Sequence, residues 1–468
     1  MWVLKKTSTI LISVALMFSW LLATPLSAAE AETEVLTLSG SISMALEKSL
    51  SLDSADKAIE KAEWEKKKAF KGFLPTVSGA YSYTRLDEAP SSSVVTYGAF
   101  NNGAGVGSLF PLVPTGTRHV TVGTEDNYQA KLTLAQPIFT GFKLKSTYDL
   151  AKLGIDTAKV DKEREILDVI LKAKESYFGI LQAEKALQVA DQAVKQFEAH
   201  LNVARNFYNE GMSTKNQVLE AEVNLAEAVQ TRIKAENALL LARAGFNNLL
   251  RRPIDAPIRV EDILAYKPFV HDLQYCLDQA LRLRPEIKAI LLKIDMANEQ
   301  VHLSRAGYFP AVALAANQTW KGDSYQVRGS SYMDDYDSWD VTVGMTWEFW
   351  NWLKTRDAVK GSKASRDIAH NGLTQIRDGI RLEVNHFFLS LKEAEKQIFV
   401  AEKAIARAEE NYRMSEERYR VQIGTSTEVI DAATLLTSAR RRYYDALYSY
   451  NLAWADLERG MGFGRDGI

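Results

Sequence analysis

The chain has 468 residues, of which 46% are hydrophobic and 25% charged, and its formal net charge is -2. These values exclude a disordered or collagen-like chain and give no general case for nucleic-acid binding. The single cysteine, Cys276, excludes an intramolecular disulfide bond and a cysteine-rich metal site. Only 11 prolines and 26 glycines occur, and this scarcity favours long helices.

Residues 1–29 have the pattern of a secretory signal peptide. Lys5 and Lys6 precede an apolar run at 10–22, and small residues follow. We expect cleavage after Ala29 or Ala31. An N-terminal membrane anchor is the alternative, although the apolar run is short for a membrane span. No second run of about 18 apolar residues follows, so a part that enters a membrane would have to be a closed β-barrel.

Two halves of the chain repeat one order of signals: two shorter helices, a strand, a loop, a strand and a long helical hairpin. We assign the first repeat to residues 30–260 and the second to 261–468. From Val218, nine of ten positions spaced by three and four residues are apolar. After a shift of 211 residues, all eight such positions from Val429 to Ala453 are apolar. The shared alternation of large residues with alanine indicates a duplication with left-handed coiled-coil packing.

The two hairpins are predicted at about 143–250 and 353–458. The first long helix, at about 144–209, would be on the order of 100 Å long at ~1.5 Å per residue. An uncapped helical pattern of this length is typical of a coiled coil or an elongated assembly. Gly211 and Gly424 mark the turns of the hairpins, and the second turn is expected to be about two residues shorter than the first.

Four runs of alternating apolar and polar residues predict four strands. Each run is near the ~9–11 residues that a tilted strand needs to cross a bilayer. Four strands cannot close a barrel around a channel, so several copies of the chain must each donate four. A soluble sandwich is the alternative, but four strands fill a sandwich poorly. The strands are assigned to about 74–85, 128–138, 311–320 and 339–349.

Aromatic residues gather near the ends of these strands, as a girdle at a membrane interface requires. We assign to the girdle Tyr81, Tyr83, Trp320, Trp339, Trp347, Phe349, Trp350 and Trp352. The segment at 86–127 is expected to be a long loop rich in serine and glycine, whereas that at 321–338 is short and polar. Long loops on one side and helices on the other match an outer-membrane barrel with a periplasmic extension.

In this order the elements resemble the TolC family of outer-membrane export ducts. The residues that carry the resemblance are the two hairpin turns, Leu74-Pro75 and Phe309-Pro310 before the first strand of each half, and Arg284-Pro285-Glu286-Ile287. The resemblance covers the whole mature chain. It implies a fold that is mainly α with a membrane β-barrel portion, in which a homotrimer forms a twelve-stranded barrel and an α-helical tunnel.

The resemblance also implies where the chain works and with which partners. The barrel would lie in the outer-membrane lipid of a Gram-negative bacterium, with the helices in the periplasm. A periplasmic adaptor (a membrane fusion protein) and an inner-membrane pump of the RND, ABC or MFS type would drive efflux or type I secretion through a passive duct. The adaptor would contact the hairpin tips at Gly211, Ser213, Thr214, Gly424, Thr425 and Thr427. The pump class and the substrate stay open.

The closed end of such a duct lies, by the resemblance, at the hairpin turns. Its acid-x-x-acid element would be Glu428 and Asp431, and three copies would place six carboxylates near the axis, where they would attract cations. A solvated pair of acids at a helix start is the alternative. An aspartate, a tyrosine and an arginine lock the closed state in some members. The matching residues here are Gln217, Val421 and Ser426, so Gln217 joins the constriction without the same ionic lock.

Motifs for catalysis, cofactors and metals are set aside. The six histidines show no His-Glu-x-x-His spacing, and no helix is expected after the glycines at 103–107. Asp334, Asp335, Asp337 and Asp340 lack the full calcium-loop pattern. We therefore expect no enzyme, no cofactor and no metal site. The alternative function, a soluble periplasmic coiled-coil adaptor or scaffold, explains the long hairpins but not four amphipathic strands.

Overall fold

The computed structural model describes residues 35–99, 112–332 and 337–464. The predicted signal peptide, the glycines at 103–107, and Asp334 and Asp335 lie outside the described residues. The chain forms two compact units, each built from three segments. The hairpin unit contains the chain up to Ser49, Val169–Phe269 and Leu389–Asp456. The sheet unit contains Leu50–Asp168, Val270–Phe388 and the chain from Leu457 onward.

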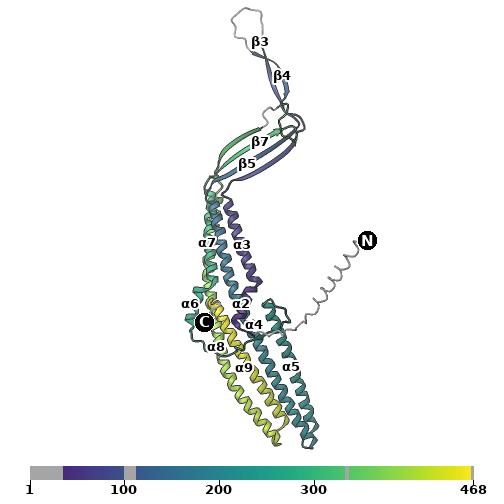
Figure 1. Ribbon diagram of the computed structural model, residues 1–468. Coiled ribbons are helices and arrows are strands. Elements are labelled where there is room, and N and C mark those ends of the chain that lie inside the picture. The colour runs from purple at the N-terminus through teal and green to yellow at the C-terminus, as the bar shows by residue number, and fades with distance from the viewer. Residues whose placement is uncertain (1–34, 100–111, 333–336, 465–468) are drawn as a thin grey trace, which may run out of the picture. The chain divides into compact units, whose positions relative to one another are not determined.

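The hairpin unit is built mostly from four long helices (Figure 1). Two of them, α4 and α8, have 67 residues each and continue into the sheet unit. A short parallel strand pair, which the sequence did not predict, joins β1 to β6. The elements are α4 (Lys143–Asn209), α5 (Lys215–Leu249), α8 (Lys354–Arg420), α9 (Ser426–Met461), α2 (Leu38–Lys48), β1 (Val35–Leu36) and β6 (Arg259–Val260).

The sheet unit holds an antiparallel four-stranded sheet in the order β2-β5-β7-β8. Its pairing joins the two halves of the chain at β5 and β7, and β5 has a bulge at Pro137, which has no N–H to donate to a ladder. The strands are β2 (Thr76–Arg85), β5 (Asp126–Thr140), β7 (Ala311–Gly322) and β8 (Asp337–Thr346). The helices are α3 (Leu50–Lys71), α6 (Leu273–Leu283), α7 (Pro285–Arg305) and the 3-10 turn η1 (Ala306–Tyr308).

The elements of the second half follow those of the first at two fixed shifts. α2 and α6, α3 and α7, and β2 and β7 all begin 235 residues apart. β5 and β8, α4 and α8, and α5 and α9 all begin 211 residues apart. The difference, 235 minus 211, is 24 residues, and it falls in the segment between the two strands of each half. The duplication is therefore visible residue by residue, and one insertion in the first half accounts for the change of shift.

Two local predictions differ from the structure. Part of the expected loop at 86–127 folds into a hairpin of β3 (Ser91–Ala99) and β4 (Leu112–Thr121), because valine, threonine and tyrosine there favour extended backbone. β8 ends at Thr346, so Trp347 and Phe349 follow the strand rather than belong to it. Trp352 and Leu353 have φ of 52° and 65°, matching 61° and 69° at Gly141 and Phe142, so a left-handed kink starts the long helix in both halves.

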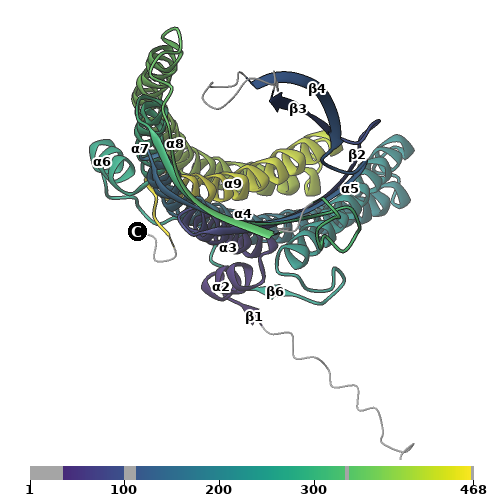
Figure 2. The same ribbon diagram turned by 90° about the horizontal axis from the view of Figure 1, so that it is seen from above.

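The core of the hairpin unit follows the predicted heptad seam. On α9 seven of the eight seam residues are buried, namely Val429, Ala432, Leu436, Ala439, Ala446, Tyr450 and Ala453. Small alanines in this seam let neighbouring helices approach closely. Figure 2 shows α8 and α9 side by side when the molecule is seen from above. Within the described ranges, no helix combines the length and apolar character needed to cross a bilayer.

Candidate functional site

The turns of the two long hairpins have the same length in the structure. α4 ends at Asn209 and α5 begins at Lys215, while α8 ends at Arg420 and α9 begins at Ser426, so five residues form each turn. The expectation of a shorter second turn is therefore wrong. Hydrogen bonds repeat at the same shift: Met212 N–H donates to Phe207 O at 2.8 Å, and Ile423 N–H donates to Arg418 O at 2.9 Å.

The error came from pairing Gly211 with Gly424. The residue that matches Gly211 is Gln422, since both have left-handed backbone, with φ of 73° and 62°. This backbone closes the last turn of a helix and is usually occupied by glycine. Glutamine pays a steric cost there, and its side-chain amide compensates in part by donating to Met212 Sδ at 2.9 Å. Gly424 lies two residues later, at the position of Ser213.

Gln422→Gly is expected to stabilise the second turn by roughly 0.5–1 kcal/mol, because glycine adopts left-handed backbone without a clash between Cβ and the carbonyl. Gly211→Ala should destabilise the first turn by a similar amount. Hydrogen exchange of the tip amides measures both changes. Gly424→Ala is the matched control, since Gly424 does not have positive φ among the described residues. Slower exchange in that control than in Gln422→Gly would contradict the assignment.

The predicted adaptor-contact residues lie on these two turns. Gly211, Thr214, Thr425 and Thr427 are exposed, whereas Ser213 and Gly424 are half-buried. Thr214 is the N-cap of α5, and Thr425 Oγ accepts from the Glu428 N–H at 3.3 Å at the start of α9. Both turns thus present capped helix starts with polar side chains to a partner.

The structure places the three predicted constriction residues in two different settings. Glu428 and Asp431 are exposed on the first turns of α9, and Glu428 lies 4.0 Å from the Arg418 guanidinium. Gln217 is half-buried instead, and its side-chain oxygen accepts from Ser213 Oγ at 2.7 Å and from Tyr419 Oη at 3.3 Å. Gln217 therefore connects the two hairpins of one chain.

The sequence interpretation missed Glu220. A shift of 211 places Gln217 opposite Glu428 and Glu220 opposite Asp431, so the motif Gln217-Val-Leu-Glu220 repeats the acid-x-x-acid element with one amide. Glu220 accepts from Thr427 Oγ at 3.4 Å and lies beside the second turn. Applying the seam's shift of 211 to the turns would have found this third carboxylate.

A buried polar contact closes the seam between the hairpins next to these residues. His200 Nε2 lies 2.9 Å from Ser426 Oγ, and its ring packs against Tyr419 at 5.2 Å between centroids. Burial lowers the pKa of His200 to about 4, and burial also raises the pKa of Tyr419. The histidine is therefore neutral at physiological pH, and α4, α8 and α9 meet around an uncharged contact.

The four-stranded sheet has one apolar and one polar face. Trp339, Val341, Val343 and Met345 alternate along β8 and are exposed in the single chain. On the other face, Thr133 Oγ donates to Asn317, whose amide donates to Asp340, both at 2.9 Å. A monomeric protein rarely exposes an apolar surface of this kind without a lipid or protein neighbour.

The predicted girdle residues lie at the two ends of this sheet. At one end the strand register brings together Tyr83, Trp320 and Trp339, with Tyr81 two residues further in. At the other end lie residues that follow β8: Trp347, Phe349, Trp350 and Trp352. Trp347 Nε1 donates to Tyr308 O at 3.2 Å, and Trp350 packs edge-on against Trp352. All but Trp320 are exposed.

A buried ion cluster in the sheet unit explains Arg284 of the Arg-Pro-acid motif. Arg284 is only 3% exposed; it pairs bidentately with Glu286, at 3.0 and 3.2 Å, and also donates to Glu383. Arg459 completes the cluster by contacting Glu286 at 3.0 Å and Asp168 at 2.9 Å. Burial opposes ionisation, but the paired charges outweigh it and raise the pKa of Arg284 and lower that of Glu286.

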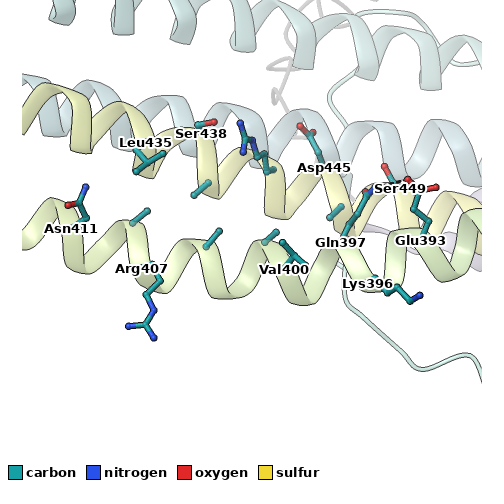
Figure 3. Close-up of a pocket in the computed structure, with 16 residues that line it drawn as sticks. Glu393, Lys396, Gln397, Val400, Arg407, Asn411, Leu435, Ser438, Asp445 and Ser449 are labelled. Atoms are coloured by element: carbon teal, nitrogen blue, oxygen red, sulfur yellow. Dashed lines mark hydrogen bonds between the residues drawn. The ribbon is translucent and has the colours of Figure 1, made fainter.

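A groove of about 980 Å³ runs between α8 and α9 (Figure 3). Alanines of both helices form its floor, and Val400 and Leu435 are exposed along it. Charged groups, among them Glu393 and Arg407, lie at its edges. Within the part of the chain that the structure describes, no three His, Cys, Asp or Glu residues are arranged to hold a metal ion.

Comparison with known proteins identifies the family. The family model "Outer membrane efflux protein" matches residues 41–250 and 276–462. The alkaline protease secretion protein AprF of Pseudomonas aeruginosa is 21% identical over 345 residues, 71% of this chain and 69% of AprF. Protein CyaE of Bordetella pertussis is 26% identical over 340 residues, 70% of this chain and 69% of CyaE.

A solved structure agrees with the predicted fold class. The CmeC outer-membrane channel of Campylobacter jejuni superposes with a TM-score of 0.71 at 17% identity, covering 92% of this chain and 87% of that one. The predicted resemblance and the outer-membrane location are thus confirmed, and the adaptor or scaffold alternative is not supported. Because the family model matches well over half of the chain, this protein belongs to the outer membrane efflux protein family, whose members are outer-membrane efflux and secretion channels.

Proposed function

We propose that the chain assembles as a homotrimer that conducts solutes passively out of the periplasm, with the constriction at its hairpin tips. An adaptor would bind the tips around Gly211 and Thr425, and an inner-membrane pump would supply the energy. The relatives AprF and CyaE are 21% and 26% identical to this chain, and the name of AprF refers to protease secretion, so a secretion pump fits as well as an efflux pump. The substrate is not specified by these features.

The sheet supports insertion of the trimer into lipid. Trp339 and Trp347 are eight residues apart, which is about 27 Å at ~3.4 Å per residue. This distance is close to the ~25 Å apolar band that aromatic girdles border in outer-membrane proteins. Three sheets of four strands, with the polar face inward and the apolar face outward, would give a closed sheet of twelve strands.

The single observation that carries the constriction is the pair of exposed acids at the start of α9. Glu428 and Asp431 lie one helical turn apart and point away from the buried seam. The Arg418 guanidinium, 4.0 Å from Glu428, balances one of these charges only in part, since both groups are exposed. Glu220 adds a third carboxylate to each chain beside the same turn.

Glu428→Gln combined with Asp431→Asn is expected to remove most of the cation preference of the channel. Six carboxylates would be neutralised in the trimer, and the six would otherwise attract cations to the narrowest point. The reversal potential in planar bilayers under a potassium chloride gradient measures this change. It should move toward zero.

Glu417→Gln is the control for this experiment, because Glu417 is an exposed acid on α8 close to the same tip. Its reversal potential should stay at the wild-type value. A double variant with unchanged selectivity would remove Glu428 and Asp431 from the constriction, while a conductance in that same variant would keep the channel function.

A further inference from the structure

The groove between α8 and α9 has a filled counterpart in the same chain. A shift of 211 residues places Ala404, Ala408 and Asn411 of α8 opposite Ala193, Phe197 and His200 of α4. The three α8 residues line the open groove, whereas the three α4 residues are buried. Two copies of one structural unit thus differ in whether the groove is occupied.

The occupant of the first groove is α9. Phe197 forms a buried cluster with Ile430 and Ala433 of that helix. Polar contacts flank the cluster: Gln182 Nε2 donates to Asp445 at 2.9 Å, and an Arg440 N–H donates to Gln192 Oε1 at 2.8 Å. Together with the contact between His200 and Ser426, these bonds hold α9 against α4.

The helix that corresponds to α9 is left uncovered. At a shift of 211, Ser426, Ile430 and Ala433 of α9 match Lys215, Leu219 and Glu222 of α5. Leu219 is 49% exposed, compared with 6% for Ile430, and Lys215 and Glu222 are exposed too. Each chain therefore carries an empty groove on one hairpin and an uncovered ridge on the other.

We propose that α5 of a second copy of the chain lies in the α8–α9 groove, in the way that α9 lies against α4 within one chain. The proposal rests on the homotrimer proposed above and specifies its interface. The contact is heterologous, since different surfaces of the two copies meet, so repeated copies close into a ring when the rotation allows it.

Charge complementarity supports the second copy as the occupant. The pair of Gln182 and Asp445 becomes Glu393 of one copy and Lys234 of the next, which are opposite charges on exposed side chains. The pair of His200 and Ser426 becomes Asn411 and Lys215, an acceptor and a donor. Glu393 lines the open groove, where its only printed bond is from the Gln397 side chain at 3.0 Å.

Thiol cross-linking of the purified full-length assembly tests the interface. The chain with Lys234→Cys and Glu393→Cys, treated with a short bismaleimide, should give a ladder of joined copies that ends at the closed ring. Each single variant should give no ladder, because only one side of the contact then carries a new thiol. The native Cys276 is buried and so adds little background. Lys234→Cys with Glu410→Cys is the matched control, since Ala199, the counterpart of Glu410, stays exposed although α9 covers α4.

Thiol protection gives a second readout. Ala404→Cys should react with a bulky maleimide at least ten-fold more slowly in the assembly than Glu410→Cys does. A trimer by native mass spectrometry that shows no cross-link and a reactive Ala404→Cys would overturn this interface and leave the proposed trimer standing. A monomer would overturn both. Protection of Ala404→Cys that occurs only after an adaptor is added would assign the groove to the adaptor instead.

Discussion

Arg284→Ala is expected to destabilise the sheet unit by about 3–5 kcal/mol. The substitution leaves Glu286 and Glu383 close together, half-buried and with only Arg459 as a shared cation. Removing one partner of a buried ion cluster costs this much because the charges that remain are neither solvated nor paired. Chemical denaturation of the protein in detergent, followed by tryptophan fluorescence, measures the loss as a lower midpoint.

Two further variants separate charge from geometry. Arg284→Lys keeps the charge but loses the two-pronged contact with Glu286, so its loss should be intermediate. Arg282→Ala, an exposed arginine one turn earlier, should change stability by less than about 0.5 kcal/mol. Equal losses for Arg282→Ala and Arg284→Ala would contradict the role given to the buried cluster.

The same cluster predicts the response to acid. Because the pKa of Glu286 is lowered in the folded state, its stabilisation is present above its ordinary pKa near 4.5 and is lost as pH falls through the folded value. Wild type should therefore lose stability below about pH 4.5. Arg284→Ala should lose less over that range, since the contact that lowers the pKa of Glu286 is already weakened.

The regular parts of the fold could be predicted because they depend on periodicity. The heptad spacing from Val429 to Ala453 identified the buried seam of α9, and alternation in β8 from Trp339 onward identified the apolar face. Both patterns follow from how side chains project from a helix or a strand. The resemblance to the family then gave the fold class, while the trimer itself stays a prediction.

The turns and the buried polar contacts could not be predicted in the same way. Gln422 has left-handed backbone, and glutamine carries no signal for it, so the glycine at 424 was mistaken for the turn residue. Arg284 and Glu383 are 99 residues apart in the chain, and their contact depends on how α7 and α8 pack. Long-range contacts of this kind leave no local pattern in one sequence.

His200 is expected to make the closed seam sensitive to pH. The folded state keeps the ring neutral down to about pH 4, whereas the opened state takes up a proton near the ordinary pKa of 6.5. The opened state therefore binds more protons between these values, so closure weakens as pH falls from 6.5 to 4 and changes no further below. At 1.36 kcal/mol per pKa unit, the total loss is about 3 kcal/mol, or a few hundred-fold in the opening equilibrium.

Hydrogen exchange of the tip amides, corrected for the intrinsic effect of pH, measures this loss. Protection in wild type should fall by up to about ten-fold per pH unit between pH 6.5 and 4. His200→Gln keeps a hydrogen-bonding partner for Ser426 but has no proton to gain, so its protection should stay flat. His386→Gln, at an exposed histidine of α8, should keep the wild-type slope. A wild-type slope in His200→Gln would show that another group controls the tips, and a flat wild-type profile would show that the seam does not open at His200.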